Sequence, residues 1–524
     1  MTTNMSTHTA RPTTDWGPSR AASQALLWLI LSLGVTLRLA KFLANRSLWL
    51  DEARLALNLL DRSPIELFQP LAYGQVAPSG FLLLEWVISR LLGAREWAFR
   101  LLPLLAGIAA LWLVYLLARR VCGPAGTLVA LALGAVADPL VNYASELKPY
   151  SSDVAIAAGL ILLALALDDR RGSGRALAGF SLAGAVAVWL SHPAIFVLAG
   201  ASLVLAVRLA WRREWRGLAR LAGASSLWVA SFLGVVLVSR SALGDTSLAG
   251  YWADAFMPFP PSSAADIDWF IRAFSGLFND VVEIPLYTGV TLLFLLGAFA
   301  MLRRQAMELG MLVVPILLAL AASGLGLYPF AHRLLLFTAP SLLVLTGRGF
   351  SFVTEEVEGR SAWLSVALGL LLLAQPVAIA VSHAADPREQ EEMRPVVDYL
   401  AEHSREGDVL YLYYNARYAF DFYARGRHPA GRVVVGKNHR EDPSAYLGEL
   451  DSLGEAPRAW LVFAHSVPGR GVPDEEGYIL GGLRCRGVQQ DRMLRQGASA
   501  YLYDLSAGAR ARVVEKDSSC ASAP

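Results

Sequence analysis

Long apolar segments are the feature of this sequence that most constrains its fold. A helix needs about 20 mainly apolar residues to cross the hydrocarbon core of a bilayer. On this rule we interpret eleven segments of the 524-residue chain as membrane spans. They lie at approximately 25–43, 99–118, 125–143, 149–167, 176–190, 194–210, 218–238, 286–302, 309–327, 334–346 and 363–381. The sequence therefore predicts a polytopic α-helical membrane protein, and 55% hydrophobic residues agree with that class.

Basic residues in the short loops predict how these spans are oriented, because Lys and Arg next to spans favour the cytoplasmic side. The most basic loops carry Arg119 and Arg120, then Arg170, Arg171 and Arg175, then the stretch 208–220, and then Arg303 and Arg304. They alternate along the chain, so the N-terminus is expected inside and the C-terminus outside. If the segment 77–93 were counted as a span, every later loop would be assigned to the opposite side of the membrane. Since it is short and carries Glu85 and Arg90, we interpret it as a helix in the outer interface.

The chain divides into three regions by composition. Residues 1–24, rich in Thr, Ser and Arg, are predicted to be a disordered cytoplasmic leader. Residues 25–382 form the transmembrane domain, whose first outer loop is 44–98. Residues 383–524 are charged and mix helical stretches, such as "RPVVDYLAEHS", with strand-like ones, such as "DVLYLYY" and "AWLVFAH". They predict an extracytoplasmic α/β domain.

Charged and polar side chains from several loops are expected on the outer face. Asp51, Glu52 and Arg54 follow the first span. The further candidates, from the first outer loop and from three later ones, are Gln75, Glu146, Lys148, Tyr150, His192, Tyr328, His332 and Arg333. Ionised groups next to hydrocarbon are costly and persist mainly where they line a polar site. This set suits an anionic lipid headgroup, with a carboxylate available for proton transfer. A net charge of +2 does not suggest nucleic-acid binding.

The order of these motifs resembles a known superfamily. The Asp-Glu pair of "SLWLDEAR" resembles the first-loop signature of the GT-C glycosyltransferases, in the branch of dolichyl-phosphate-mannose protein mannosyltransferases and lipid A aminoarabinose transferases, glycosyltransferase families 39 and 83. The stretches "GAREWAFRLLPLLAGIAALWLVYLLARR", "SELKPYS", "SHP" and "YPFAHR" follow in the same style. The resemblance covers roughly residues 25–423. It implies a GT-C fold and an inverting transfer of sugar from a polyprenyl-phosphate carrier to an acceptor on the outer face.

The resemblance also implies roles for individual residues. The family's catalytic acid maps to Asp51, which makes it the expected base, with Glu52 and Glu146 as further catalytic candidates. Arg54 lies where the aminoarabinose branch has an arginine near the carrier phosphate. The remaining candidates are expected to bind lipid phosphate or sugar. The family often has two prolines before the interfacial helix, whereas this chain has "GQVAPSG", which leaves the contacts of Gln75 open. No metal or other cofactor is expected, although a metal-binding role of Glu146 stays open.

Simpler interpretations stay open beside these. Asp51 and Glu52 could be solvated carboxylates paired with Arg54, and Glu146 with Lys148 could form a weak surface pair. A lipid-linked sugar transporter or flippase is one alternative function, although no clear internal repeat is visible. A non-catalytic cell-envelope assembly protein is another. The high content of Ala, Leu, Gly and Arg favours a bacterial plasma membrane. The sequence indicates neither the sugar nor the acceptor.

Overall fold

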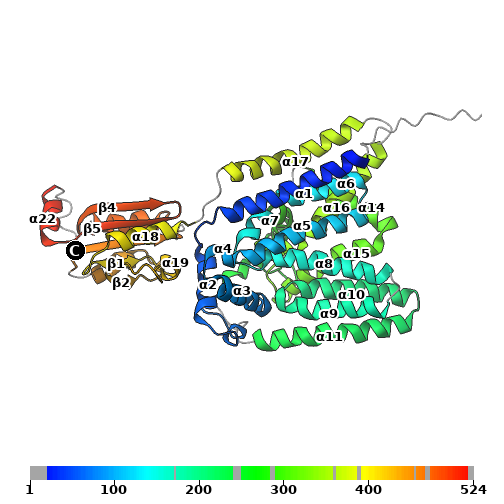
Figure 1. Cartoon of the computed structure of the whole chain (residues 1–524), viewed down its shortest axis with the longest axis horizontal. Helices are drawn as coiled ribbons and strands as arrows, with labels where there is room; N and C mark the ends of the chain where they lie inside the picture. Colours follow the sequence, from blue (N-terminus) through cyan, green and yellow to red (C-terminus); the bar gives the residue numbers. More distant parts are fainter. Residues whose placement is uncertain are drawn as a thin grey trace, which may run out of the picture.

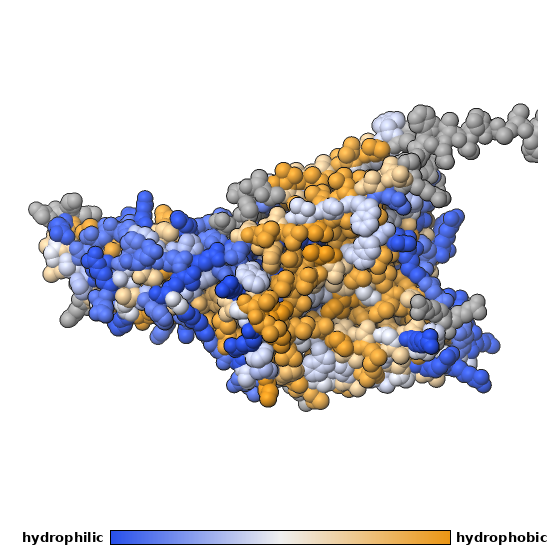
Figure 2. All heavy atoms as spheres, viewed as in Figure 1, coloured by the Kyte–Doolittle hydropathy of each residue, from blue (hydrophilic) through white to orange (hydrophobic). Residues whose placement is uncertain are grey.

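The structure is a computed structural model that describes residues 20–169, 173–239, 250–283, 289–357, 362–385, 391–453, 456–466 and 472–516. These residues form a large helical bundle, with a smaller sheet-containing domain at one end of it (Figure 1). The side of the bundle seen in Figure 2 is largely hydrophobic, whereas the smaller domain is largely hydrophilic. This arrangement confirms a polytopic helical membrane protein with a C-terminal α/β domain.

Eight helices among the described residues are long and apolar enough to cross a membrane. They are built from α1 (Arg20–Leu43), α4 with α5 (Glu96–Phe99, Leu101–Val121), α8 (Tyr150–Asp169), α10 (Ala194–Trp211), α11 (Trp215–Ser239), α15 (Ala306–Gly324), η5 with α16 (His332–Thr338, Ala339–Val357) and α17 (Ala362–Ala385). Two further predicted spans are the shorter helices α9 (Gly174–Leu190) and α14 (Val290–Arg304). Helix α1 begins at Arg20, before the predicted end of the leader, and residues 1–19 lie outside the described part.

The predicted span 125–143 is not one straight helix, which corrects the sequence interpretation. It consists of α6 (Pro124–Val136) and α7 (Asp138–Asn142), which are bent by 58° against each other. Pro139 lies in the first turn of α7. Proline has no backbone N–H and its ring clashes with the preceding turn, which favours a bend or break in the helix at this point. If this bent pair counts as one span, nine helical spans pass the test of length and apolarity within the described residues.

Glycine contacts hold α16 at the centre of the bundle. A Cβ atom added at Gly126 of α6 would lie 2.0 Å from the carbonyl oxygen of Gly347 in α16. One added at Gly349 would lie 1.8 Å from the carbonyl oxygen of Leu293 in α14. No side chain fits at either position, so the helix backbones touch directly. Such close contact favours helix association in lipid, where the hydrophobic effect does not drive it.

Smaller helices lie at the end of the bundle next to the C-terminal domain. The predicted first outer loop, residues 44–98, contains α2 (Leu50–Asp61), η1 (Glu66–Phe68) and α3 (Ser79–Leu92). Helix α3 corresponds to the predicted interfacial segment and, with 14 residues, is shorter than a span. Farther along the chain come η2 (Tyr143–Ser145), η3 (Ala253–Ala255) and α13 (Ala264–Val282).

The C-terminal domain is a five-stranded mixed sheet with flanking helices. Its strands are β1 (Val409–Leu412), β2 (Arg432–Val435), β3 (Arg458–Ala464), β4 (Val488–Arg495) and β5 (Ala498–Asp504), in the spatial order β2-β1-β3-β5-β4. Strand β1 pairs in parallel with β2 and with β3, whereas β5 pairs antiparallel with β3 and with β4. The helices are α18 (Met393–His403), α19 (Ala416–Tyr423), α20 (Ser444–Glu449), η6 (Leu450–Leu453), α21 (Glu475–Leu483) and α22 (Ala507–Lys516). The sequence analysis missed β4, an edge strand with mostly exposed, polar residues.

The C-terminal domain shares one apolar core with the first outer loop. Leu48 and Leu55 from the loop are buried in the same cluster as Met393 and Trp460 from the domain. Polar contacts cross the same boundary, because the Glu392 carboxylate accepts hydrogen bonds from the backbone N–H and the hydroxyl of Ser47, at 3.0 and 2.8 Å. The two parts are therefore joined by a continuous core and by buried hydrogen bonds.

The contacts of Glu392 predict a loss of stability when its carboxylate is removed. Glu392→Ala leaves the N–H and hydroxyl of Ser47 without their partner in a buried place, and we expect a cost of about 1–3 kcal/mol. Thermal unfolding in detergent measures it. Glu402→Ala, at an exposed position of α18, the helix that begins directly after Glu392, is the matched control. Equal melting temperatures for the two variants would contradict the role of this contact.

Candidate active site

Helix α2 carries the predicted Asp51 and Glu52 in its first turn, and the residues before it fix where this turn lies. The backbone N–H of Leu48 donates to the hydroxyl of Tyr423, at 2.7 Å. That of Leu50 donates to the Glu391 carboxylate, at 2.8 Å. Leu48 precedes the helix and Leu50 is its first residue, so neither N–H has a partner within the helix, and these contacts satisfy groups that would otherwise be buried and unpaired. The C-terminal domain thus holds the start of α2 in place.

Asp51 lies among side chains from three other segments. Its Oδ2 is 2.9 Å from an Nη of Arg333 and 3.6 Å from the Nζ of Lys148. Lys148 also donates to the Oε1 of Gln75, at 2.8 Å. The Asp51 side chain keeps 15% of its surface exposed, so the group is enclosed but still reachable. Four residues selected from the sequence therefore meet at one point.

Nearby cations keep Asp51 ionised. Burial by itself raises the pKa of Asp51, but Lys148, Arg333 and Arg54 outweigh it and hold the pKa below its ordinary value. Burial lowers the pKa of Lys148, although Asp51 opposes this effect. At neutral pH Asp51 is a carboxylate in a cationic surrounding. It can accept a proton, and the cations beside it can bind an anion.

Aromatic side chains form one wall of this site. The guanidinium carbon of Arg333 lies 6.0 Å from the centre of the Tyr150 ring. Tyr143 packs edge-on against Tyr150, with their ring centres 5.0 Å apart. The predicted residue Tyr150 thus borders the cationic group, although no ion pair or hydrogen bond joins it to Asp51 within the described part of the chain.

Glu52 points to a different set of partners from Asp51, because neighbouring residues on a helix are about 100° apart. It is fully buried and forms a two-pronged ion pair with Arg100, at 2.9 and 2.6 Å. It also accepts from the backbone N–H of Leu147, at 2.8 Å. Burial would raise the pKa of Glu52, but Arg100 outweighs it and the pKa lies below its ordinary value. Glu52 thus joins the first turn of α2, which also carries Asp51, to Arg100 and to the backbone of Leu147.

Glu146 is also buried and paired. Its Oε1 lies 3.3 Å from Arg46 and accepts a hydrogen bond from the amide of Asn142, at 2.9 Å. Burial raises the pKa of Glu146 despite the nearby Arg46. Neither Glu146 nor Lys148 is a surface group, so the surface-pair interpretation does not describe them.

Arg54 does not pair with Asp51 or Glu52, although all three lie in the described residues. Its guanidinium carbon lies 4.4 Å from the ring centre of Tyr418, at the start of α19 in the C-terminal domain. Tyr73 from the first outer loop packs against the same ring, at 5.1 Å. Arg54 still acts on Asp51 through its charge, which helps to lower the pKa of that carboxylate. It therefore lies at the boundary between the site and the C-terminal domain.

Three other predicted residues contact groups other than Asp51. His332 pairs with Asp280 of α13 at 2.9 Å, and its side chain is 70% exposed. Tyr328 donates to the carbonyl oxygen of Leu334 at 2.8 Å and packs against Phe196. His192 lies between α9 and α10, and burial lowers its pKa to about 4. The structure thus places these side chains around the site without joining them to its carboxylate.

Sequence reasoning missed the residues that support the site. They are Arg46, Arg100, Glu391 and Glu392, all of them buried. A charged residue next to an apolar run, as in "REWAFRLLP", is a signal that could have identified Arg100. Within the described residues, no group of three or more His, Cys, Asp or Glu side chains is arranged to hold a metal ion.

Comparisons with known proteins bear on the fold that carries this site. Residues 76–240 match the family described as dolichyl-phosphate-mannose-protein mannosyltransferase. No curated protein matches the chain by sequence. ArnT from Cupriavidus metallidurans bound to undecaprenyl phosphate has a similar structure, with a TM-score of 0.54 and 14% identity over 93% of this chain and 99% of that one. The apo form of an oligosaccharyltransferase from Archaeoglobus fulgidus gives a TM-score of 0.52 and 13% identity over 93% and 75%. The fold is therefore the GT-C fold, as the sequence resemblance implied.

The buried pair of Glu52 and Arg100 predicts strong effects on stability. Arg100→Met leaves a carboxylate buried without its partner, and we expect a loss of about 3–5 kcal/mol. The double variant Arg100→Met with Glu52→Gln should recover part of this loss, because neither position then holds a charge that has lost its partner. Unfolding in detergent at pH 7 measures both. Equal stability of the single variant and the wild type would contradict this role.

The same pair gives a pH dependence. The folded-state pKa of Glu52 lies below 4.5, its ordinary value, so the pair stabilises the fold above that pH and its contribution is lost as the pH falls. The stability difference between wild type and the double variant should therefore shrink under acid conditions.

Proposed function

We propose that this protein is an inverting glycosyltransferase that moves a sugar from a polyprenyl-phosphate carrier to an acceptor on the outer face of a bacterial plasma membrane. The observation that carries this proposal is the ionised carboxylate of Asp51, held between Arg333 and Lys148 at one end of the membrane bundle. The GT-C fold supports it, and so does the similarity to the structure of ArnT bound to undecaprenyl phosphate. The donated sugar and the acceptor are not specified by these observations.

Asp51 acts as the general base in the proposed reaction. It takes the proton of the acceptor hydroxyl while that oxygen attacks the anomeric carbon from the side opposite the phosphate. The bond between the anomeric carbon and the phosphate oxygen breaks, and the lipid phosphate leaves with the electron pair. The configuration at the anomeric carbon is thereby inverted. Since Asp51 is already ionised at neutral pH, no prior deprotonation is needed.

Cations at the site stabilise the leaving phosphate. Lys148 and Arg333 face Asp51 directly, and both can donate to phosphate oxygens as negative charge develops there. Arginine is suited to this role because its planar guanidinium can donate two parallel hydrogen bonds. Arg54 adds positive charge from the side of the C-terminal domain. We assign Glu52 and Glu146 to positioning, since their carboxylates are occupied by Arg100 and Arg46. The proposed reaction uses no metal cofactor.

Two observations support an outer location of the site. The ends of α5, α10 and α14 that carry Arg119, Arg120, Arg208, Arg303 and Arg304 lie at the end of the bundle away from the C-terminal domain (Figure 1). The positive-inside rule assigns that end to the cytoplasm. In addition, Cys485 of the C-terminal domain is disulfide-bonded, which fits an oxidising compartment. Residue Cys520 lies outside the described part.

A transporter or flippase is less well supported. The charges of Asp51, Lys148 and Arg333 lie at the end of the bundle beside the C-terminal domain. Transporters of lipid-linked substrates are expected to bind near the middle of the membrane, where helices are interrupted. The helix break between α6 and α7 lies one residue before Asp138, which pairs with His383 in the last turn of α17.

Replacing the base tests the reaction. Asp51→Asn should reduce sugar transfer by about 10²–10⁴-fold, because the amide cannot accept the proton. Binding of the carrier should persist, since Lys148 and Arg333 lose a competing anion. The assay uses purified protein, a panel of radiolabelled polyprenyl-phosphate sugars and membrane extract as the acceptor source, with EDTA present in a parallel series.

Asp268→Asn is the matched control, because this aspartate lies in α13 with a side chain that is 60% exposed. It should transfer at the wild-type rate, and EDTA should leave that rate unchanged. Normal turnover by Asp51→Asn would refute the assigned base. If none of the donors supports sugar transfer although the carrier binds tightly, the flippase or assembly function would be favoured.

Cysteine labelling tests the orientation. Ser262 and Ser173 are exposed, and they are assigned to opposite sides of the membrane. In intact cells, a membrane-impermeant maleimide should label Ser262→Cys, whereas Ser173→Cys should react only after permeabilisation. Cys122 is buried and should add little background. The opposite labelling pattern would place the site on the cytoplasmic side.

A further inference from the structure

Helix α13 carries an apolar edge that is exposed in the structure. Ile267, Ile271 and Phe274 keep 62%, 61% and 38% of their surface accessible. They follow one another at spacings of four and three residues, so they lie along one line of the helix, which we call the apolar edge. Exposed apolar side chains that lie together in this way usually mark a surface that contacts a partner or a lipid.

The rest of the circumference of α13 is divided between protein and water. Trp269, Leu277 and Val281 are buried. Asp268 and Arg272 form a pair at 3.2 Å, with 60% and 69% of their side chains exposed. With about 100° between successive residues, the apolar edge lies between the buried side and this polar side. A helix in the plane of a membrane surface has the same order: one side on the protein, one against acyl chains and one toward water.

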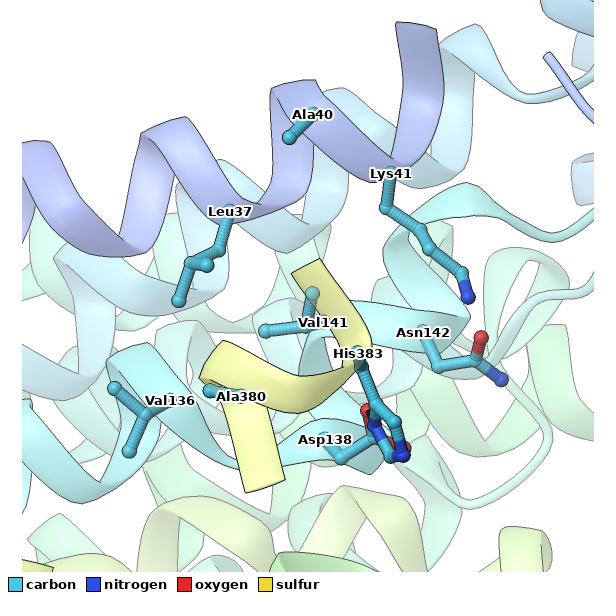
Figure 3. A pocket seen from close by; sticks show the side chains of 9 residues that line it. All are labelled: Leu37, Ala40, Lys41, Val136, Asp138, Val141, Asn142, Ala380 and His383. Carbon is cyan, nitrogen blue, oxygen red and sulfur yellow. Dashed lines mark hydrogen bonds and ion pairs between the residues drawn. The ribbon is translucent and has the colours of Figure 1, made fainter. Parts of the chain in front are cut away.

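Helix α13 lies across the end of the bundle beside the C-terminal domain. It packs on α7 and η5, and Asp280 in its last turn pairs with His332, the first residue of η5, at 2.9 Å. Helix α7 in turn contacts the last turn of α17 through Asp138 and His383, at 2.5 Å (Figure 3). Since α17 leads into the C-terminal domain, these contacts locate α13 at that end. With 19 residues α13 is long enough for a span, but it is not among the described helices that are apolar enough to cross a membrane.

The apolar edge is continuous with the hydrophobic surface of the bundle. The ring centres of Phe274 and Phe278 are 5.4 Å apart, and those of Phe278 and Phe294 are 5.5 Å apart. Phe294 lies in the first half of α14, where Leu292 and Leu295 are 61% and 53% exposed. Exposed leucines of a helical bundle in a bilayer face acyl chains, which are equally apolar. The lipid-facing surface of α14 therefore extends onto α13.

We propose that α13 lies in the plane of the membrane surface on the side of the C-terminal domain, with its apolar edge among the acyl chains of the surrounding phospholipids. The charges of the helix argue against recognition of anionic headgroups. It carries Asp266, Asp268 and Asp280 against a single cation, Arg272. In-plane helices that bind anionic lipids are instead rich in Lys and Arg. Contact through the apolar edge alone is therefore expected.

The position of α13 bears on the candidate active site through η5. His332, which pairs with Asp280, is followed by Arg333, which pairs with Asp51. A helix fixed at the membrane surface holds Arg333 near the level of the lipid headgroups, where the phosphate of a membrane-bound carrier lies. This consequence for the carrier rests on the proposed function. The contact of α13 with lipid does not, and it can be measured without any sugar transfer.

Spin labels on the full-length protein test the proposal. Ile271→Cys and Asp268→Cys are labelled and reconstituted separately into phosphatidylcholine vesicles, and collisions with oxygen and with a water-soluble nickel complex are compared. Cys122 is buried and Cys485 is disulfide-bonded, so the label is directed to the new cysteine. The label of Ile271→Cys should collide mainly with oxygen and lie about 5–10 Å into the boundary between headgroups and acyl chains. The label of Asp268→Cys should collide mainly with the nickel complex.

Matched variants provide the references. Leu317→Cys, at a position of the span α15 that is 54% exposed, shows the behaviour of a label among acyl chains. Ile267→Cys should behave like Ile271→Cys, because both lie on the apolar edge. Since the substituted side chains of α13 are exposed, these variants should melt at the wild-type temperature. Addition of phosphatidylglycerol to the vesicles should leave the depth of each label unchanged.

Three results would overturn the proposal. Equal access of the nickel complex to the labels of Ile271→Cys and Asp268→Cys would show that the apolar edge lies in water. Little collision of either reagent with the label of Ile271→Cys would favour contact with protein, such as a second copy of the chain. Insertion that requires phosphatidylglycerol would favour recognition of headgroups. An inserted label in a protein that transfers no sugar would support the lipid contact and contradict only the proposed function.

Discussion

The buried ion pair between Glu52 and Arg100 is the interaction on which the geometry of the site depends. It joins the first turn of α2 to the start of α5, and Glu52 also accepts from the backbone of Leu147. Arg100 in turn donates to the carbonyl oxygens of Arg46 and Ser47. Two charges buried in this way are favourable only if their hydrogen-bonding capacity is filled. The pair therefore fixes three chain segments at once, and Asp51, one residue before Glu52, is directed toward Lys148 and Arg333.

The different surroundings of the neighbouring carboxylates Asp51 and Glu52 follow from this ion pair. Glu52 has no exposed surface and has several fixed partners, as a structural group requires. Asp51 keeps some exposure and faces cations, as the general base that we propose would require. The same first turn of a helix thus carries both the supporting carboxylate and the one to which we assign the reaction. The C-terminal domain completes the arrangement through Glu391 and Glu392, which bind the backbone before and at the start of α2.

Much of the fold could be predicted from the sequence, because apolar length and period are local properties. The spans, the short helix α3 and the buried strands β1 and β3 follow from them. The break before α7 was missed, although Pro139 is its signal, because hydropathy does not register a bend. Strand β4 was missed because an exposed edge strand has no apolar alternation.

The site could be predicted only in part. The sequence assigned Asp51, Lys148, Arg333 and Gln75 to one face of the membrane, and the structure brings them together. The sequence could not indicate that His332 turns toward Asp280 or that Arg54 lies on Tyr418. The side of the membrane on which a residue lies does not determine where its side chain points. The contacts of Glu391 and Glu392 join residues more than 340 positions apart in the chain. No local pattern contains such information.

That separation has a consequence for the order of assembly. Membrane spans enter the bilayer as the chain is synthesised, so α1 and α2 are in place long before residues 391 and 392 leave the ribosome. Until then, the backbone groups at the start of α2 lack the partners that the finished structure gives them. The first turn of α2 therefore reaches its final position only after the last span has been inserted and the C-terminal domain has folded on it. A truncated or stalled chain would contain every membrane helix and still lack an ordered site, so the complete arrangement around Asp51 is restricted to completed molecules.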